Sequence, residues 1–172
     1  MNQIERIYRQ HIDDLYAYGM HLGFEENLVK DCIQNIFEKL LLKPKLKIEN
    51  TKAYLFKSVR NELLTEFKKS NKNLSIELAK HKMPFDIQVS IEEVLLEKET
   101  KTLLKNKVEA VLKDLSPRQR EIIYFRYTLE YDYDMISEIM GISVASSRNL
   151  VLKALNHFRK NGLNFFAFTF FI

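Results

Sequence analysis

The stretch LSPRQREIIYFRYTLEYDYDMISEIMGISVASSRNLVLKALNHFRK, residues 115–160, predicts three consecutive helices with explicit start and stop signals. The first helix begins at Ser116 and Pro117. Ser116 is a favourable N-cap, and proline is tolerated in a first turn because its missing N–H would have no partner there. Gln119, three residues after Ser116, completes the pattern of a capping box. The chain is therefore expected to enter a helix at this point.

A helix-turn-helix is predicted within the same stretch. Asp132 is suited to cap a second helix, which Gly141 would end in a left-handed turn. Ser143 would cap a third helix from residue 144 to about residue 160. Two short helices joined by a turn that contains glycine are typical of a helix-turn-helix, whose second helix usually enters the DNA major groove.

The third helix has two distinct sides at 3.6 residues per turn. The side expected to pack inward holds Ser147, Val151, Ala154, Leu155 and Phe158. The opposite side holds Ala145, Asn149, Leu152, Lys153 and Asn156, flanked by Ser146 and Arg148. Arginine, lysine, asparagine and serine bond base edges and phosphates. A solvated polar face is the alternative for this helix alone, but the preceding caps and turn favour DNA binding.

Composition indicates an all-α protein with one large or two small domains. The chain has 172 residues, of which 46% are hydrophobic, with only 4 glycines and 3 prolines. The net charge is +4, but residues 43–72 contain nine Lys or Arg against three Glu. Such a basic segment can attract a polyanion, although a solvated helix surface is the common alternative.

The residue inventory argues against several functional classes. The single cysteine, Cys32, excludes an intrachain disulfide and favours a reducing compartment. The four histidines show no metal-ligand spacing, and no catalytic motif is visible. The polar N-terminus lacks the pattern of a signal peptide. We therefore expect a cytoplasmic, non-enzymatic protein without cofactor or metal and without membrane insertion of its own.

Two helices, at residues 2–22 and about 25–42, are expected at the N-terminus. The apolar side of the second includes Cys32, and its other side presents Asp31, Gln34 and Glu38 at helical spacing. From the residues alone, plain solvent exposure of that polar side is the favoured interpretation.

A third N-terminal helix, from residue 51 to about residue 69, carries an aromatic and basic face. Thr51 is the expected cap, and the outward residues include Tyr54, Lys57, Asn61 and Lys68. Aromatic rings, amides and lysines together suit single-stranded nucleic acid, because bases stack while lysines hold phosphates. An exposed tyrosine on a lysine-rich helix explains the pattern equally well.

The polar segment 70–89 lacks sustained periodicity and is predicted to be a flexible linker. It would join a helical domain at 1–69 to a second at 90–160. Ser90 and Glu93 predict a capping box that opens a helix to about residue 114. That helix is expected to pack on the helix-turn-helix through five apolar residues: Leu95, Leu103, Val108, Val111 and Leu112.

The last part of the chain, residues 161–172, is an apolar tail with the sequence NGLNFFAFTFFI. It contains five phenylalanines. The tail is too short to span a bilayer as a helix, which needs roughly 20 residues. Folding back onto the second domain is the favoured interpretation. A further hypothesis is that the tail covers a DNA- or partner-binding surface until it is displaced.

Across residues 4–160 the chain resembles the extracytoplasmic-function (ECF) group of bacterial RNA polymerase sigma factors. DCIQNIFEKLL resembles the conserved helix of region two, and KAYLFKSVRNELLTEFKK resembles the helix that melts promoter DNA. In the latter, Tyr54 stands where tryptophan is usual. LSPRQREIIYFRY and DYDMISEIMGISVASSRNLVLKAL resemble the start and the helix-turn-helix of region four. Glu130 stands where a glycine is common.

The resemblance implies specific roles. Asp31, Gln34 and Glu38 would bind core RNA polymerase, and an anti-sigma factor would be a further partner. The residues implied at the single-stranded minus-ten element are Tyr54, Lys57, Asn61 and Lys68. Those implied at the minus-thirty-five element are Ser146, Arg148, Asn149 and Lys153.

Two other functional classes stay open at this stage. A self-sufficient helix-turn-helix repressor or activator would bind duplex DNA alone, usually as a dimer. A helical scaffold for protein docking is the second alternative. The two-domain layout and the basic helices argue against both, and an enzyme fits least because no catalytic constellation is visible.

Overall fold

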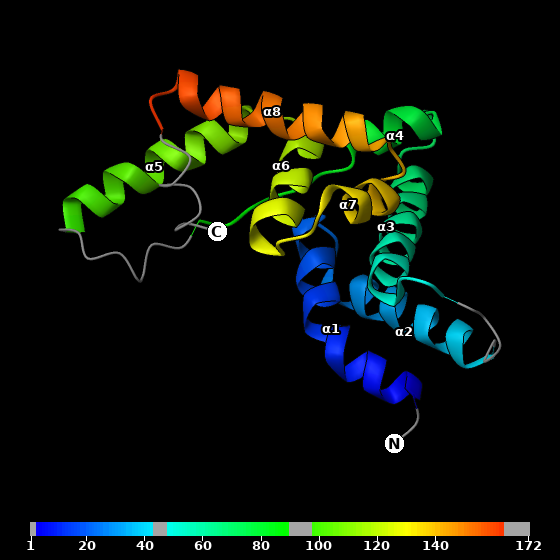
Figure 1. The fold of residues 1–172 in the computed structure, drawn as a ribbon. Helices are drawn as coiled ribbons and strands as arrows, with labels where there is room; N and C mark the ends of the chain where they lie inside the picture. Colours follow the sequence, from blue (N-terminus) through cyan, green and yellow to red (C-terminus); the bar gives the residue numbers. More distant parts are fainter. Residues whose placement is uncertain (1–2, 43–47, 90–97, 164–172) are drawn as a thin grey trace. The chain divides into compact units, whose positions relative to one another are not determined.

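The computed structural model describes residues 3–42, 48–89 and 98–163, and every regular element in these ranges is helical (Figure 1). The predicted all-α class is therefore confirmed. None of these helices is both long enough and apolar enough to cross a membrane. Contacts divide the chain into two compact units, Met1–Pro84 with Glu138–Gly141 and Phe85–Ser137 with Ile142–Ile172.

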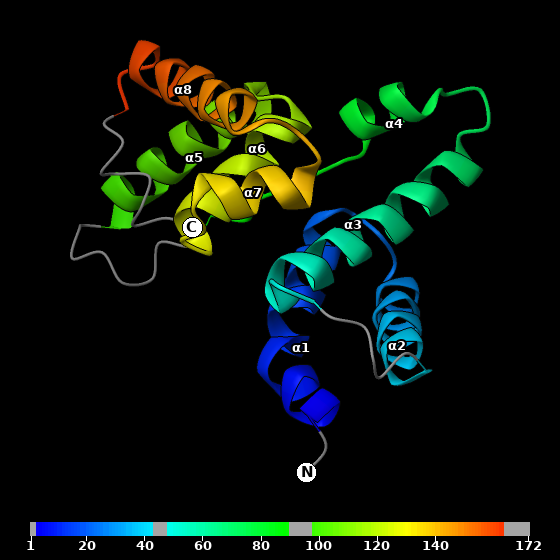
Figure 2. The same cartoon turned by 45° about the vertical axis from the view of Figure 1, so that its right-hand side comes forward.

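The first unit is built on three helices, α1 (Gln3–His21), α2 (Glu26–Leu42) and α3 (Thr51–Ser70), which all contact one another (Figure 2). Its core is made of fully buried apolar side chains: Leu15, Tyr18, Val29, Phe56, Val59 and Leu63. Gly19 permits close approach of α1 and α2, because a Cβ at that position would lie only 2.4 Å from Val29 Cγ1. Any larger residue there would push the two helices apart.

The cap of α3 differs from the prediction. Asn50, rather than Thr51, is the N-cap, with extended backbone at φ −122° and ψ 92°. Its Oδ1 accepts a hydrogen bond of 3.0 Å from the backbone N–H of Ala53. Thr51 is instead the first residue of the helix. Asparagine and threonine are both good caps, so the sequence alone did not separate these adjacent positions.

A short helix, α4 (Ile76–Lys82), lies inside the range predicted to be a linker. Ser75 caps it by accepting a hydrogen bond of 3.2 Å from the backbone N–H of Leu78. Ala79 and Met83 are buried. The helix that Ser75 begins has only 7 residues and was too short to produce a periodic pattern in the sequence. The assignment of 70–89 as a linker stays a prediction.

In the second unit, α5 (Lys98–Asp114) buries Val108, Val111 and Leu112, as predicted. The expectation for Leu103 was wrong, because this side chain is 71% exposed. Leu103 precedes Val108 by five residues, which turns it about 140° away from the buried side of the helix. The predicted capping box and Leu95 lie outside the described residues.

The helix after α5, α6 (Pro117–Ile123), begins with the predicted capping box. It continues as the π-helical turn η1 (Tyr124–Thr128), where Leu129 N–H donates 3.1 Å to Tyr124 O. The π-helical turn was not predicted. Glu130 follows with φ +56°, a left-handed conformation that L-residues rarely adopt. That conformation explains why glycine is common here in the family that the sequence resembles.

The predicted caps of the helix-turn-helix are confirmed. Asp132 Oδ1 accepts a hydrogen bond of 2.8 Å from Met135 N–H at the start of α7 (Tyr133–Met140). Gly141 has φ +63° and ends α7. Ser143 then caps α8 (Val144–Lys160) through a hydrogen bond of 3.1 Å from Ser146 N–H. The turn between the two helices is thus specified at both of its ends.

Candidate nucleic-acid interfaces

The buried side of α8 is the one predicted from helical spacing. Val151, Ala154 and Phe158 are buried, and Leu155 is half-buried. Ser147 also lies on this side and is fully buried. Its hydroxyl donates a hydrogen bond of 2.7 Å to Val144 O, so a polar side chain on the packing side has a partner. This packing holds the opposite side of α8 toward solvent.

All four residues proposed to contact duplex DNA lie on exposed positions of α8. Within the described part of the chain, the side chains of Asn149 and Lys153 form no hydrogen bond or ion pair. Ser146 differs, because its Oγ accepts a hydrogen bond of 2.9 Å from Ser143 Oγ. Asn149 and Lys153 are therefore available to bind a base edge and a phosphate.

Arg148 on the same helix is close to an aromatic ring. Its guanidinium carbon lies 5.5 Å from the ring centroid of Tyr133, the first residue of α7. Arg126 of η1 lies 5.2 Å from the same centroid. Neither Arg126 nor Tyr133 was among the predicted site residues. Residues 126–133 contain one arginine and several tyrosines, which could have suggested a ring contact. Which ring an arginine contacts, however, depends on the geometry of the turns.

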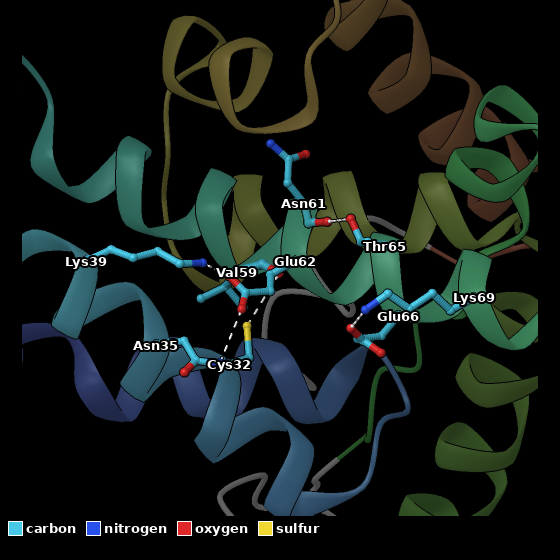
Figure 3. Close-up of polar contacts among 9 residues, drawn as sticks. All are labelled: Cys32, Asn35, Lys39, Val59, Asn61, Glu62, Thr65, Glu66 and Lys69. Carbon is cyan, nitrogen blue, oxygen red and sulfur yellow. Dashed lines mark hydrogen bonds and ion pairs between the residues drawn. The ribbon is translucent and has the colours of Figure 1, made fainter.

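In the first unit, α2 and α3 line an open groove of about 470 Å³. Tyr54 and Asn61, two of the predicted residues, belong to its lining together with Ser58 and Thr65. In Figure 3 the side chain of Asn61 extends away from the backbone of α3. Lys57 and Lys68, also predicted, are exposed on α3 but are not part of the groove lining. The structure thus groups the aromatic and amide residues and separates them from these two lysines.

Two carboxylates in this groove were missed by the sequence analysis. Glu62 Oε2 lies 3.1 Å from Lys39 Nζ, and Glu66 Oε1 lies 2.6 Å from Lys69 Nζ (Figure 3). Each carboxylate is therefore paired with a lysine of the same groove. Glu62 directly follows Asn61, so the two side chains are only about 100° apart around the helix. This spacing could have indicated that Glu62 lies next to the predicted face.

Cys32 lies on α2 and is not a reactive group. Its side chain is 3% exposed, and its Sγ lies 3.9 Å from Val59 O (Figure 3). Burial, assisted by the negative charge of Glu62, raises the pKa of the thiol to about 12. A thiol with that pKa is almost fully protonated at neutral pH, so Cys32 acts as a core residue.

The polar side of α2 is exposed, as predicted. Asp31, Gln34 and Glu38 all lie on the surface, and Gln34 Nε2 donates a hydrogen bond of 2.8 Å to Glu38 Oε1. Gln34 and Glu38 belong to the lining of a mainly apolar groove of about 760 Å³ between α1 and α2. The apolar lining consists of Tyr8, Ile12, Tyr16, Ile33, Phe37 and Leu41. A mainly apolar groove with some polar residues in its lining has the composition of a protein-docking surface.

Comparisons with known proteins agree with this geometry. Residues 105–158 match the family Sigma-70, region 4. The chain is 22% identical over 152 residues to the ECF RNA polymerase sigma factor SigM of Bacillus subtilis (strain 168). That match covers 88% of this chain and 90% of the relative.

Two solved structures share the fold. One is a chain from the complex of the sigma factor RpoE with the anti-sigma factor NepR of Bartonella quintana. It has a TM-score of 0.62 at 20% identity, covering 94% of this chain and 97% of that chain. The other is a chain from the PhyRSL–NepR complex of Sphingomonas sp. Fr1, with a TM-score of 0.61 at 12% identity. This second match covers 92% of this chain and 88% of the other.

The family match and the helix-turn-helix assign residues 105–158 to the sigma-70 region 4 class. More specifically, the region 4 match and the similarity to SigM over most of the chain support the ECF group of RNA polymerase sigma factors, the family that the sequence resembles.

Proposed function

We propose that the chain directs core RNA polymerase to specific promoters through three separate faces. The observation that carries this proposal is the exposed side of α8 in the matched region 4, where Asn149 and Lys153 have no side-chain partner among the described residues. The proposed function consists of binding free energies and includes no catalytic step. Those free energies would position the polymerase and stabilise unwound DNA.

The first face would read duplex DNA at the minus-thirty-five element. Asn149 can bond the edge of an adenine, while Lys153 and Arg148 can bind phosphate or guanine. Ser146 can donate its hydroxyl proton to a phosphate oxygen, because in its hydrogen bond with Ser143 it acts as the acceptor. Because cations on this face release counterions from DNA, the affinity should fall steeply with salt.

The second face, on α3, would hold the unwound non-template strand at the minus-ten element. The groove of about 470 Å³ is large enough for an extruded base. Tyr54 can stack on that base and Asn61 can bond its edge, while Lys57 and Lys68 can contact phosphates outside the groove. Stacking would offset the cost of unstacking, which is a few kcal/mol for each base.

The third face would dock on core polymerase through Asp31, Gln34 and Glu38. Asp31 is exposed and forms no ion pair within the described residues, so its charge is available to a basic partner surface. The adjacent apolar groove between α1 and α2 would add buried area to the same interface.

An anti-sigma factor is the proposed regulatory partner. The support is that both solved structures of similar fold are complexes that contain NepR. A protein that covered the polar side of α2 or of α8 would block core docking or DNA binding.

Run-off transcription tests the proposed function. Core polymerase of the source organism would be incubated with genomic DNA, with and without the full chain. New start sites that depend on the chain are expected, and the mapped ends would yield the promoter motif. Duplex binding by the chain alone, without new start sites, would favour a self-sufficient repressor or activator instead.

The docking face has its own test. Asp31→Lys replaces the negative charge of Asp31 with a positive one. The amount of core polymerase pulled down should fall about tenfold or more, because like charges at an interface cost several kcal/mol. The matched control is Glu99→Lys on α5, an exposed acidic residue in the other unit. If both variants retained core equally well, the docking face would have to lie elsewhere.

A further inference from the structure

One aromatic ring in the helix-turn-helix unit carries two arginines. The guanidinium carbon of Arg126 lies 5.2 Å from the ring centroid of Tyr133, and that of Arg148 lies 5.5 Å from it. The three residues come from η1, from the first turn of α7 and from α8. The turns after η1 and α7 thus bring two positive charges to one half-buried ring.

The two arginines are held to different degrees. Arg126 is anchored, because its Nη1 donates a hydrogen bond of 3.0 Å to Tyr131 O and its guanidinium also lies 6.0 Å from the ring centroid of Tyr127. Arg148 is exposed, and within the described residues its only specific contact is with Tyr133. Neither arginine forms an ion pair in that part of the chain. Their charge is therefore not neutralised by a neighbouring carboxylate.

Contact with a ring leaves an arginine able to bind an anion. Cation–π contact uses the face of the guanidinium, whereas its five N–H donors point outward in its plane. Those donors match the spacing of phosphate oxygens. Holding a long side chain in place before binding also reduces the conformational entropy that is lost when the contact forms.

We propose that Tyr133 is a positioning residue, which holds Arg148 beside Arg126 so that both can bind the phosphate backbone next to the bases contacted by α8. This inference rests on the proposed promoter-binding function and adds two residues, Arg126 and Tyr133, to its duplex-binding face. Two adjacent cations repel each other in the free protein. A phosphate bound between them would relieve that repulsion, which favours the bound state further.

The test compares four variants as full chains bound to core polymerase on a duplex promoter fragment: Tyr133→Leu, Tyr133→Phe, Arg148→Ala and Tyr133→Leu with Arg148→Ala. The measurements are the affinity and its dependence on salt. Tyr133→Leu removes the ring that holds Arg148 beside Arg126 and should weaken binding about two- to tenfold. Tyr133→Phe keeps the ring and should restore binding to within about twofold. Arg148→Ala should also lower the slope of log affinity against log salt by about one.

The double variant distinguishes positioning from a merely structural role. If Tyr133 acts through Arg148, adding Tyr133→Leu to Arg148→Ala should have almost no further effect on affinity or salt slope. Fully additive losses, or a salt slope unchanged in Tyr133→Leu, would overturn the proposal. Equal weakening by Tyr133→Phe and Tyr133→Leu would overturn it as well.

Failure of the proposed function would be separate from failure of this inference. If wild-type holoenzyme did not bind the promoter, the promoter-binding function itself would be refuted. If wild-type bound normally and the losses of Tyr133→Leu and Arg148→Ala were additive, only the positioning role would be lost.

A folding control and one further variant complete the test. Circular dichroism of each variant would identify any that failed to fold, and Arg126→Lys would then repeat the test without altering Tyr133. That variant keeps a charge but loses the planar fork, so its affinity should fall about two- to tenfold if the arginine pair binds phosphate. Unchanged affinity would overturn the proposal.

Discussion

Helices α8 and α3 both present polar faces proposed to bind DNA, but their electrostatics differ. On α8 the side chains of Asn149 and Lys153 are exposed and have no partner within the described residues. In the α3 groove, Glu62 and Glu66 each pair with a lysine. An unpaired cationic surface suits phosphates and duplex DNA. A groove whose charges are already paired suits bases, because stacking and hydrogen bonding to bases do not require net positive charge.

The largest effect expected from this contrast is on duplex binding by α8. Asn149→Ala combined with Lys153→Ala should weaken promoter binding by holoenzyme at least about tenfold, since one base contact is worth about 1–3 kcal/mol. The loss should grow smaller as salt rises, because the phosphate contribution of Lys153 is screened. Electrophoretic mobility shift over a salt series measures both quantities.

The matched control for that variant is Asn106→Ala with Lys113→Ala on α5, where both residues are exposed. It removes the same two residue types from the same unit and should leave promoter affinity unchanged. Equal affinities for the α8 variant and for wild-type would break the contrast, because α8 would then not be the duplex-binding helix.

The next effect concerns stacking on α3. Tyr54→Ala should destabilise the open complex by about 1–3 kcal/mol, the contribution of one stacked base, with little effect on closed-complex binding. Tyr54→Phe keeps the ring and should retain most of the stability. Permanganate footprinting of unpaired thymines measures the open complex. Loss of closed-complex binding in Tyr54→Ala would mean that α3 contributes to duplex recognition as α8 does.

A smaller effect sharpens the contrast in charge. Glu62→Gln would release Lys39 from an ion pair that is partly exposed, with Glu62 26% accessible, and remove a negative charge from the groove. Binding of a single-stranded minus-ten oligonucleotide should improve about 1.5- to fivefold, since such pairs contribute about 0.2–1 kcal/mol. Fluorescence anisotropy measures the change, with Glu99→Gln as the control. Weaker binding in Glu62→Gln would indicate that the carboxylate itself accepts a hydrogen bond from a base.

The smallest effect is on the stability of the unit that contains α3. His11 of α1 is 8% exposed, and burial followed by the charge of Lys52 lowers its pKa below 6.5, against a smaller raising effect of Asp14. The folded state binds the proton less readily than the unfolded state. The stability that His11 contributes is therefore complete above pH 6.5 and is lost as the pH falls below 6.5 and through the folded pKa.

Two measurements check this pH dependence. An NMR titration of the histidine rings should give His11 a lower pKa than 6.5. The melting temperature of the first unit should fall between neutral pH and about pH 5, by an amount that His11→Gln reduces. A melting temperature with the same pH dependence in wild-type and in His11→Gln would show that other groups dominate.

Local signals in the sequence were sufficient for the helix-turn-helix. Ser116, Asp132, Gly141 and Ser143 each act within a few residues of their own position, through a side chain that accepts a backbone N–H or through a left-handed turn. The exposed side of α8 follows from the helical repeat alone. Short-range hydrogen bonding and periodicity do not depend on the rest of the fold, and for this reason they could be predicted.

Other features depended on contacts between segments distant in sequence. The ion pair of Lys39 with Glu62 joins α2 to α3, and the ring of Tyr133 meets Arg126 and Arg148 from two further helices. The exposure of Leu103 likewise depends on which side of α5 packs against other residues. The sequence by itself determined the class, the ends of the helices in the helix-turn-helix and the exposed side of α8. Only the tertiary structure decided which charges are paired, because pairing depends on the distance between side chains that different helices bring together.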